Sequence, residues 1–580
     1  MRNVVCFLCV ALALFLPATD GQSADVPPVR IAYFVPRDRE PIPGYQQRVD
    51  RVMQEVQRFY REGMNAAGYG PMTFALERSL DDALVVHLVQ AQEPMAHYGR
   101  DASADVRREV QAALAKSNID MDQNTWVIFQ VLLQWDGDRA TEVGPYVGGG
   151  NHLAGTAWVY DDERLDPQQL ASQAKGGYYG RPCSLGEFNS HYIGGVAHEL
   201  GHAFGLPHDC QRQSDLSRGL SLMGGGNHTY GQELRGEGTG AYLNAGSAML
   251  LAHSRPFAGD LPQAKKRPTC QIQNFDAQFV DGKIVLTGQI TADPPAFGIV
   301  AFDDWAQVPS DYDAVTWTCG LDQGRFRLEI GELRVGASQL RLWVCHDNGA
   351  TSRFEFDYQV DQSGIPNLDA LRYSLPLSEA IAAYYRRDRT RARAAIQDLE
   401  RRFSNIPEVQ RKAAHLQTLL NPPRPLPLSQ IKSQDGWTCI TRAPFVTAQV
   451  GWGRPLVDEV LGQEAEECFL SVGGEFFERG LFAHAPAKHA VDLATQWTRF
   501  RAGYGLQDGH AGSVVFVIRG DGKELFRSTQ IRDHQLRHLD VDVTGVKILE
   551  LIVEDGGDGT HSDWGVWLQP ELSQVHPAGK

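Results

Sequence analysis

The chain has 580 residues, of which 42% are hydrophobic, so it is long enough for about four domains with an ample core. Lysine and arginine total 55 against 71 acidic residues, which gives a net charge of -16. A chain this acidic repels phosphate backbones, so a nucleic-acid partner is not expected.

The first segment, residues 1–24, has the composition of a secretory signal peptide: one arginine, a short apolar core and small residues near its end. We therefore expect a secreted or extracytoplasmic protein, in the periplasm or at the cell surface. The apolar run is too short to span a bilayer comfortably and no later run is longer, so no transmembrane segment is expected. An uncleaved anchor stays open as an alternative.

The cysteines also fit an oxidising compartment. Cleavage of the signal peptide would leave Cys183, Cys210, Cys270, Cys319, Cys345, Cys439 and Cys468, an odd number that cannot all pair within the chain. By domain membership, the first pairs to expect are Cys183 with Cys210 and Cys439 with Cys468. Sequence alone does not determine the connectivity.

Strands and helices alternate before residue 198. VRIAYFVP from Val29 and NTWVIFQVLL from Asn124 are typical of buried strands, whereas residues 44–66 and 102–116 carry helical spacing of apolar positions. The stretch GGGNHLAGTAWVY, residues 148–160, is expected to form an edge strand above a cleft, where its backbone would pair with an extended peptide.

Residues 198–209 read HELGHAFGLPHD. Positions i and i+4 lie on one face of a helix, so His198 and His202 can bind one metal ion while Glu199 lies beside the same face. Gly205 permits a turn because it can adopt a positive φ, which brings His208 in as a third ligand. One coordination position then stays open for a water whose pKa the metal lowers to roughly 7. With Glu199 as the base, this arrangement predicts peptide hydrolysis.

The string resembles the HExxHxxGxxH pattern of the metzincin clan of zinc metallopeptidases, in which a methionine turn follows downstream. The resemblance implies a zincin-like peptidase domain over residues 28–265, with Zn²⁺ on the three histidines. Met223 in LSLMGGGNHTYG is the better candidate for the methionine turn, and Met249 in GSAMLL is the second.

The family within the clan stays open. Asp209 after the third histidine resembles the adamalysin-like branch. The tyrosine that some metzincins carry two residues after the methionine is absent, since Gly225 occupies that place, and Tyr230 is a weak substitute. Two further histidines nearby, His152 and His191, are predicted to be packing or rim residues.

The composition changes at residues 256–268, which indicates a domain boundary. Residues 269–360 contain short alternating runs such as KIVLTGQI and FRLEIGEL, separated by turn residues, a pattern typical of an immunoglobulin-like β-sandwich. We expect this segment to be a spacer or recognition module without chemistry. Residues 365–420 are predicted to form a helical segment, and residues 421–429 a stiff proline-rich linker.

Residues 430–575 are again rich in predicted strands. The order GLFAHAPAKHAVDL, WTRFRAGYGLQDG, GSVVFVIRGDGKELFRS and LDVDVTGVKILELIVEDGGDGTHSDWGVW resembles carbohydrate-binding modules of the NPCBM type. The resemblance implies a β-sandwich that holds sugar, with His484, Asp508, Asp563 and Trp564 as the matching candidates. Sugar recognition needs an aromatic face and polar groups, but each of these four residues could equally define the fold.

Together these patterns predict a multidomain α+β protein: a zincin-like metallopeptidase domain, a β-sandwich, a short helical segment and a C-terminal β-sandwich. The predicted function is a secreted zinc-dependent endopeptidase directed to glycoprotein or polysaccharide-associated substrates by the sugar-binding module. The alternative is a cell-surface carbohydrate-binding or adhesion protein whose zinc site is structural or silent. A glycosidase ranks third, because no pair of carboxylates can be placed around a sugar bond.

Overall fold

The computed structural model describes residues 26–179, 181–306, 311–462 and 468–574. The chain divides into two compact units, Met1–Leu371 and Arg372–Lys580. The predicted signal peptide, residues 1–24, lies outside the described residues. None of the helices in these ranges combines the length and the apolar character that crossing a membrane requires.

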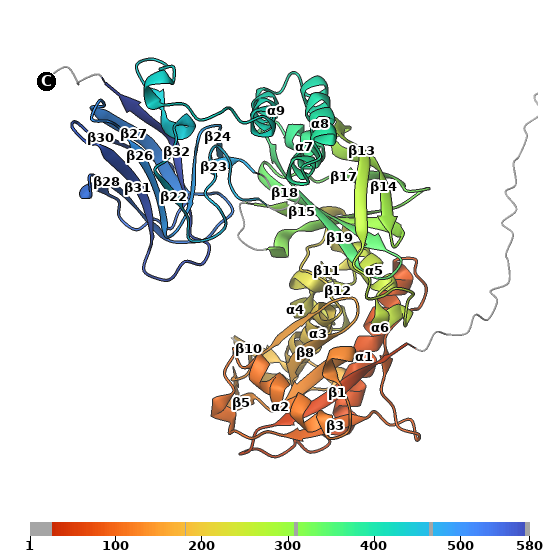
Figure 1. Cartoon of the computed structure of the whole chain (residues 1–580). Coiled ribbons are helices and arrows are strands. Elements are labelled where there is room, and N and C mark those ends of the chain that lie inside the picture. Colours follow the sequence, from red (N-terminus) through yellow and green to blue (C-terminus); the bar gives the residue numbers. More distant parts are fainter. Residues whose placement is uncertain (1–25, 180, 307–310, 463–467, 575–580) are drawn as a thin grey trace, which may run out of the picture. The chain divides into compact units, whose positions relative to one another are not determined.

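The first domain is built on a six-stranded sheet of order β2-β1-β4-β8-β7, with β3 also paired to β1 (Figure 1). All pairs are parallel except that of β7 with β8. The strands are β1 (Pro28–Val35), β2 (Ala75–Leu76), β3 (Val86–Gln90), β4 (Thr125–Gln130), β7 (Val147–Gly150) and β8 (Gly155–Tyr160). The main helices are α1 (Tyr45–Ala66), α2 (Ser103–Ala115) and α3 (Leu185–Ala203). The predicted strands 29–36 and 124–133 and the helices 44–66 and 102–116 are therefore confirmed, with ends shifted by at most three residues. The predicted edge strand 148–160 is instead two strands, β7 and β8, and only β7 lies at the edge of the sheet.

Smaller elements complete this domain. A second sheet has the order β10-β9-β6-β5, and β11 pairs with β12. These elements are β5 (Leu133–Asp136), β6 (Arg139–Glu142), β9 (Lys175–Tyr179), β10 (Arg181–Ser184), β11 (Leu220–Ser221), β12 (Ala241–Tyr242), α4 (Asn227–Thr229), α5 (Ala245–Ala252) and α6 (Arg255–Ala258).

Helix α1 buries one face on the sheet. Val49, Val52, Met53 and Val56 are fully buried, at the spacing of one helical stripe. Tyr60 continues this stripe, and its hydroxyl donates a hydrogen bond to the Ala197 carbonyl of α3, 2.8 Å away. The first helix of the domain is thereby fixed to the helix that carries the histidine motif.

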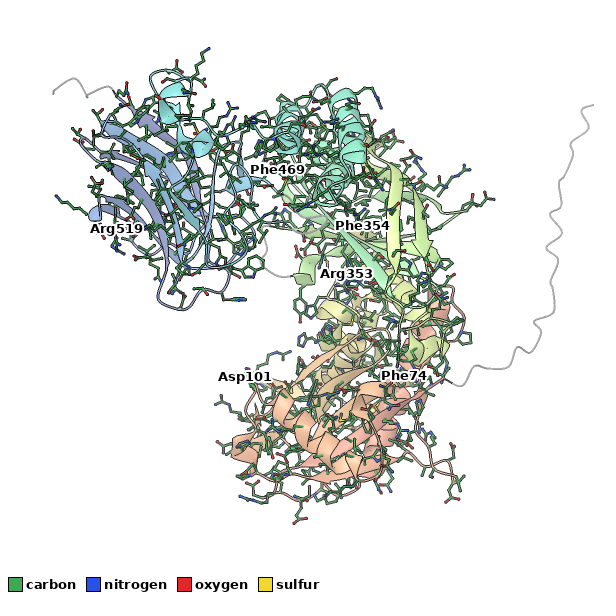
Figure 2. The ribbon with its side chains drawn as sticks, in the orientation of Figure 1. Phe74, Asp101, Arg353, Phe354, Phe469 and Arg519 are labelled. Carbon is green, nitrogen blue, oxygen red and sulfur yellow. The ribbon has the colours of Figure 1, made fainter. Side chains whose placement is uncertain are left out.

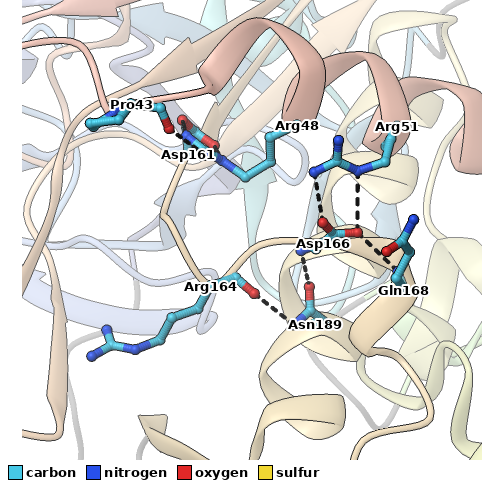
Figure 3. Close-up of polar contacts among 8 residues, drawn as sticks. All are labelled: Pro43, Arg48, Arg51, Asp161, Arg164, Asp166, Gln168 and Asn189. Carbon is cyan, nitrogen blue, oxygen red and sulfur yellow. Dashed lines mark hydrogen bonds and ion pairs between the residues drawn. The ribbon is translucent and has the colours of Figure 1, made fainter.

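Polar side chains also connect the N-terminal end of α1 to α3 (Figure 3). Arg48 Nε donates to Asp161 at 2.8 Å, and Arg51 donates to Asp166 at 2.7 Å. The backbone NH of Asp166 in turn donates to the Asn189 side chain of α3 at 2.7 Å. Breaking a buried ion pair costs about 3–5 kcal/mol, so the buried Arg48–Asp161 pair resists displacement of α1.

The middle domain consists of two antiparallel sheets, as predicted. One has the order β13-β14-β17 and the other β16-β15-β18-β19-β20. The strands are β13 (Thr269–Val280), β14 (Lys283–Asp293), β15 (Ala296–Trp305), β16 (Val315–Gly320), β17 (Arg325–Ile330), β18 (Gly336–His346), β19 (Thr351–Val360) and β20 (Pro366–Asn367). Phe275 of β13 stacks on Phe356 of β19 at 5.3 Å between ring centroids, which joins the two sheets.

This sandwich belongs to the same compact unit as the first domain. Helix α5 contacts α1 on one side and strands β15 and β16 on the other. Figure 2 shows the side chains of both domains and labels the buried Phe74 in the first domain and Arg353 of β19 in the middle domain. The Arg353 guanidinium lies 3.8 Å from the ring centroid of Trp343, so even the outer face of β19 is ordered by packing.

The segment predicted as helical contains α7 (Asp369–Tyr385), α8 (Arg389–Arg402) and α9 (Pro407–Leu420). The C-terminal domain that follows has two five-stranded sheets and the hairpin β23-β24. The first sheet contains β21 (Thr438–Cys439), β25 (Gly480–His484), β27 (Arg499–Leu506), β30 (Arg537–Asp542) and β32 (Trp564–Ser573). The second contains β22 (Thr447–Gln449), β26 (Ala487–Asp492), β28 (Val514–Gly520), β29 (Lys523–Arg527) and β31 (Ile548–Asp555), and the hairpin is β23 (Leu470–Val472) with β24 (Glu475–Phe477).

The disulfide prediction is wrong for this structure. No disulfide bond joins two cysteines in the described part of the chain, so neither Cys183–Cys210 nor Cys439–Cys468 is formed. The reason for the first is that Cys210 lies against the middle domain, where its backbone NH donates to Ala314 O at 2.8 Å. Cys439 pairs with β32, and its Sγ lies 3.4 Å from Thr441 Oγ1.

Candidate metal centre and sugar-binding surface

Three imidazoles converge at the end of α3. His202 Nε2 lies 3.1 Å from His198 Nε2 and 3.0 Å from His208 Nε2. Within the described ranges, this is the one group of three or more potential ligand side chains with all ligand atoms within 4.8 Å of one another. Three nitrogens bound at about 2.0–2.1 Å around one tetrahedral ion would lie roughly 3.3 Å apart, so this group fits zinc.

The histidine motif is held by local backbone features. Ser184 and Glu187 form a capping box that begins α3, and the side chain of each accepts a hydrogen bond from the other's backbone NH, at 3.0 and 2.9 Å. After α3, Gly205 has φ +89°, which a residue with a side chain rarely adopts, and this turn brings His208 back towards the helix.

Backbone carbonyls orient the first two rings. His198 Nδ1 donates to Leu222 O at 2.8 Å, and His202 Nδ1 donates to Leu206 O at 2.9 Å. With the proton on Nδ1, the Nε2 lone pair faces the centre, which is the tautomer a metal ligand needs. Burial, together with the neighbouring His202, lowers the pKa of His198 to about 3, so this ring is neutral at physiological pH.

Glu199 follows His198 in α3, on the turn whose backbone lies against Gly148 of β7. Burial raises the pKa of the Glu199 carboxyl to about 7, although a hydrogen bond from the Gly148 backbone favours its charged form. A carboxylate with a pKa near neutrality can both take up and release a proton at physiological pH. The pair of Glu199 and the imidazoles therefore combines a proton acceptor with a ligand set.

Strand β7, the first part of the predicted edge strand 148–160, is the edge of its sheet and contacts α3. Its glycines make the close approach possible. A Cβ on Gly148 would lie 1.9 Å from the Glu199 backbone oxygen, and one on Gly150 would lie 2.1 Å from the Ala203 oxygen. Gly148 and Gly150 are thus required for the close approach of the edge strand to the motif helix, whereas a Cβ on Gly149 would meet nothing within 4 Å.

The two methionine candidates lie in different places. Met223 is fully buried against α3, where a Cβ on Gly201 would come within 2.5 Å of Met223 Sδ. Met249 instead packs with Val300 and Trp343 of the middle domain, so it is a residue of the contact between domains.

Asp209 and Tyr230, which the sequence also singled out, both have hydrogen-bond partners inside the first domain. Asp209 is buried and accepts hydrogen bonds from Ser221 and from Ser247 Oγ, the latter at 3.1 Å, so it fixes the chain after His208. Tyr230 donates its hydroxyl to Glu55 of α1 at 2.7 Å and is 3% exposed. A role for Tyr230 as substitute for the missing tyrosine is therefore wrong, because its hydroxyl is occupied inside the domain.

Sequence reasoning missed a polar row next to the imidazoles. His191 lies seven residues before His198, and therefore on nearly the same face of α3. Its Nδ1 lies 3.0 Å from His228 Nδ1, and its Nε2 lies 3.9 Å from Glu142. The i, i+7 spacing could have identified His191, which was predicted to be structural. His152, by contrast, contacts Ala264 O at 3.0 Å, which fits the predicted packing role.

In the C-terminal domain, the four predicted sugar-binding residues have different surroundings. Asp508 accepts backbone hydrogen bonds from Gly473 and Gly474, both at 2.9 Å, and so supports the β23-β24 turn. Asp563 is 0% exposed and accepts from the Ser513 NH at 2.8 Å. These two carboxylates act on loop conformation.

His484 and Trp564 belong to an aromatic cluster at one end of this sandwich. Trp452 is 50% exposed, and its ring centroid lies 5.6 Å from that of Trp564 and 6.0 Å from that of His484. His510 stacks on Trp564 at 3.8 Å. Trp452 and His510 were missed by sequence reasoning, and Trp452 supplies the exposed aromatic face of the cluster.

Comparison with known proteins identifies the C-terminal domain. Residues 438–573 match the NPCBM/NEW2 domain, so the chain carries an NPCBM domain. A curated relative from Renibacterium salmoninarum, provisionally named an endo-alpha-N-acetylgalactosaminidase, is 29% identical over 131 residues, which are 22% of this chain. The match spans only 9% of that relative's length.

Solved structures resemble a larger part of the chain. Wild-type OgpA from Akkermansia muciniphila is 23% identical, with a TM-score of 0.50, and the match covers 58% of this chain and 94% of OgpA. Catalytically inactive OgpA, solved with an O-glycopeptide substrate, is 21% identical with a TM-score of 0.51, covering 60% of this chain and 98% of that one. At this level of identity the chain shares the fold of OgpA, in a multidomain protein that is mostly β with some helices.

Proposed function

We propose that this chain is a secreted zinc-dependent endopeptidase of metzincin type with a zincin-like catalytic domain. The observation that carries the proposal is the convergence of His198, His202 and His208 on one point. Glu199, whose pKa burial raises to about 7, follows His198 directly in α3. When bound there, zinc would acidify a water and polarise the scissile carbonyl. Met223 would be the residue of the methionine turn, since it is buried against Gly201, the residue before His202 in α3.

In this mechanism Glu199 acts as general base and then as general acid. Its carboxylate takes a proton from the attacking water and passes that proton to the amine nitrogen as the peptide bond breaks. The free edge of β7 would hold the substrate, because an extended peptide can add to it as a further strand. The Gly148 backbone links the two parts, since its NH hydrogen-bonds to Glu199.

Glycosylated proteins are the substrate class that we favour. The fold is shared with OgpA, which binds an O-glycopeptide, and the chain carries an NPCBM domain. The polar row of Glu142, His191 and His228 adds groups that can hydrogen-bond to sugar hydroxyls along the same helix face. All three side chains are polar, so they favour hydroxyl groups over an apolar side chain of the substrate.

The proposal predicts that an O-glycosylated peptide is cleaved at least about tenfold faster, in kcat/KM, than the same peptide without sugar, which corresponds to about 1.4 kcal/mol of transition-state binding. Cleavage products would be identified by mass spectrometry, and a chelator would abolish them. Equal rates on both peptides would reject the substrate class, and chelator-resistant cleavage would reject the metal.

The NPCBM domain is proposed to bind carbohydrate through its aromatic cluster. Replacing the exposed residue, Trp452→Ala, should weaken glycan binding by about two- to tenfold, because stacking on an aromatic face contributes about 0.5–1.5 kcal/mol. Exposed Val446→Ala, in the same domain, is the control that keeps binding. Calorimetric titration with mucin-type glycans gives the affinities, and unchanged binding by Trp452→Ala would place the site elsewhere.

The same two assays separate the alternative function. Tight glycan binding without any chelator-sensitive proteolysis would favour an adhesion protein with a structural or silent zinc site.

A further inference from the structure

One aromatic side chain beside the imidazoles comes from the middle domain. Tyr312 follows β15 in the chain and stacks on His208, with ring centroids 3.7 Å apart and 26° between the planes. Its ring is also parallel to that of His198, at 6.4 Å. Tyr312 is 48% exposed, so one part of it covers His208 while the rest faces solvent.

The backbone around Tyr312 is fixed on the side of the middle domain. Arg334 Nη1 donates to the neighbouring Asp313 carboxylate at 2.8 Å, and Arg334 Nη2 donates to the Asp313 carbonyl at 3.0 Å. Two residues further on, Val315 begins strand β16. The ring is therefore attached to a rigid element, which is what a residue needs in order to hold another side chain in place.

The chain that follows His208 is fixed to the same domain. Cys210 forms a parallel bridge with Val315, and its NH donates to Ala314 O at 2.8 Å. The Glu332 carboxylate accepts from the NH groups of Gln213 and Ser214, at 2.6 and 3.0 Å. Both the ring of His208 and the backbone after it thus depend on contacts from the middle domain.

The three ligands are held in different ways. His198 and His202 lie on α3 and donate to carbonyls of their own domain. His208 lies in the loop after α3, and the face of Tyr312 is one of the contacts that restrict the rotation of its ring. Groups that orient a metal ligand typically change metal affinity by about 10–100-fold when removed.

We infer that the middle β-sandwich is part of the metal centre and that Tyr312 is a positioning residue, which holds His208 by ring stacking. The inference rests on the proposed zinc site and deepens it, because it assigns a task to a domain expected to be a spacer. The aromatic face, and not the hydroxyl group, performs this task. The domain then cannot be exchanged for a linker without loss of zinc.

Zinc affinity of the full chain tests the inference, measured by competition with a chromophoric chelator. Tyr312→Ala should weaken zinc binding by about tenfold or more, whereas Tyr312→Phe should keep the wild-type affinity within about twofold, since it retains the ring. Phe279→Ala, a partly exposed aromatic of the same domain that lies on β13, is the matched control. Melting of the metal-free proteins shows whether each variant is folded, and Tyr312→Leu replaces the alanine variant if that one is not.

Two results would overturn the inference. One is unchanged zinc affinity in Tyr312→Ala. The other is Tyr312→Phe losing as much kcat as Tyr312→Ala with zinc affinity intact, because the hydroxyl group would then act on the substrate directly. Failure of the wild-type chain to bind zinc would instead reject the proposed function itself, so the two failures are distinguishable.

Discussion

Glu199→Gln is expected to reduce peptide hydrolysis by about 10³-fold, within the range that general acid–base catalysis contributes. Glutamine has almost the same volume and can still contact the Gly148 NH, but it cannot take a proton from water. Glu199 follows His198, the first of the three histidines, directly in α3, and burial raises its pKa to about 7, which suits proton transfer near neutrality. Initial rates on a glycopeptide measure the effect.

Zinc content must be measured on the same samples, because loss of metal would give the same loss of rate. Glu199→Gln should keep about one zinc per chain, since glutamate is not among the three ligands. Glu163→Gln, an exposed residue of the same domain, is the matched control. Near wild-type hydrolysis by fully metallated Glu199→Gln would refute the mechanism.

His202→Ala should cost the most metal. His202 Nε2 lies within 3.1 Å of both other ligand atoms, so its removal leaves two imidazoles that no longer define a tetrahedral site. Because loss of a group that only orients a ligand already costs about 10–100-fold, we expect a loss of zinc affinity beyond about 100-fold. Elemental analysis after dialysis checks this.

Activity gives the second measurement for this variant. Wild-type protein stripped with a chelator should regain activity when zinc is added, whereas His202→Ala should not. His97→Ala removes an exposed histidine of the same domain and should behave as wild type. A His202→Ala protein that retained zinc and activity would show that the three imidazoles do not form the site.

The candidate metal centre could be predicted from sequence to the extent that it is local. His198 and His202 share a helix face by the geometry of any α-helix, and Gly205 needs a positive φ for the turn to His208. The three glycines of β7 can be read from the sequence, but the need for a glycine at position 148 comes from its contact with a helix residue some fifty positions later in the chain. No periodicity in the sequence encodes such a distance.

Tyr312 shows the limit most clearly. It lies more than a hundred residues after His208, in a segment whose alternating pattern predicts only a β-sandwich. In the C-terminal domain, Asp508 and Asp563 were selected because their chemistry suits sugars, but aspartates next to turns more often bind backbone NH groups, as both do here. Exposure singles out Trp452, and exposure is a property of the folded chain.

The run Gly148–Gly150 also affects which peptides the cleft can accept. Three successive glycines offer NH and carbonyl groups to an incoming chain but have no side-chain walls that could select one amino acid over another. Selectivity along this part of β7 would therefore be low, and choice among sites would be left to other groups, such as Glu142, His191 and His228. Such an arrangement tolerates the varied sequences that surround sugar-bearing residues in heavily glycosylated proteins.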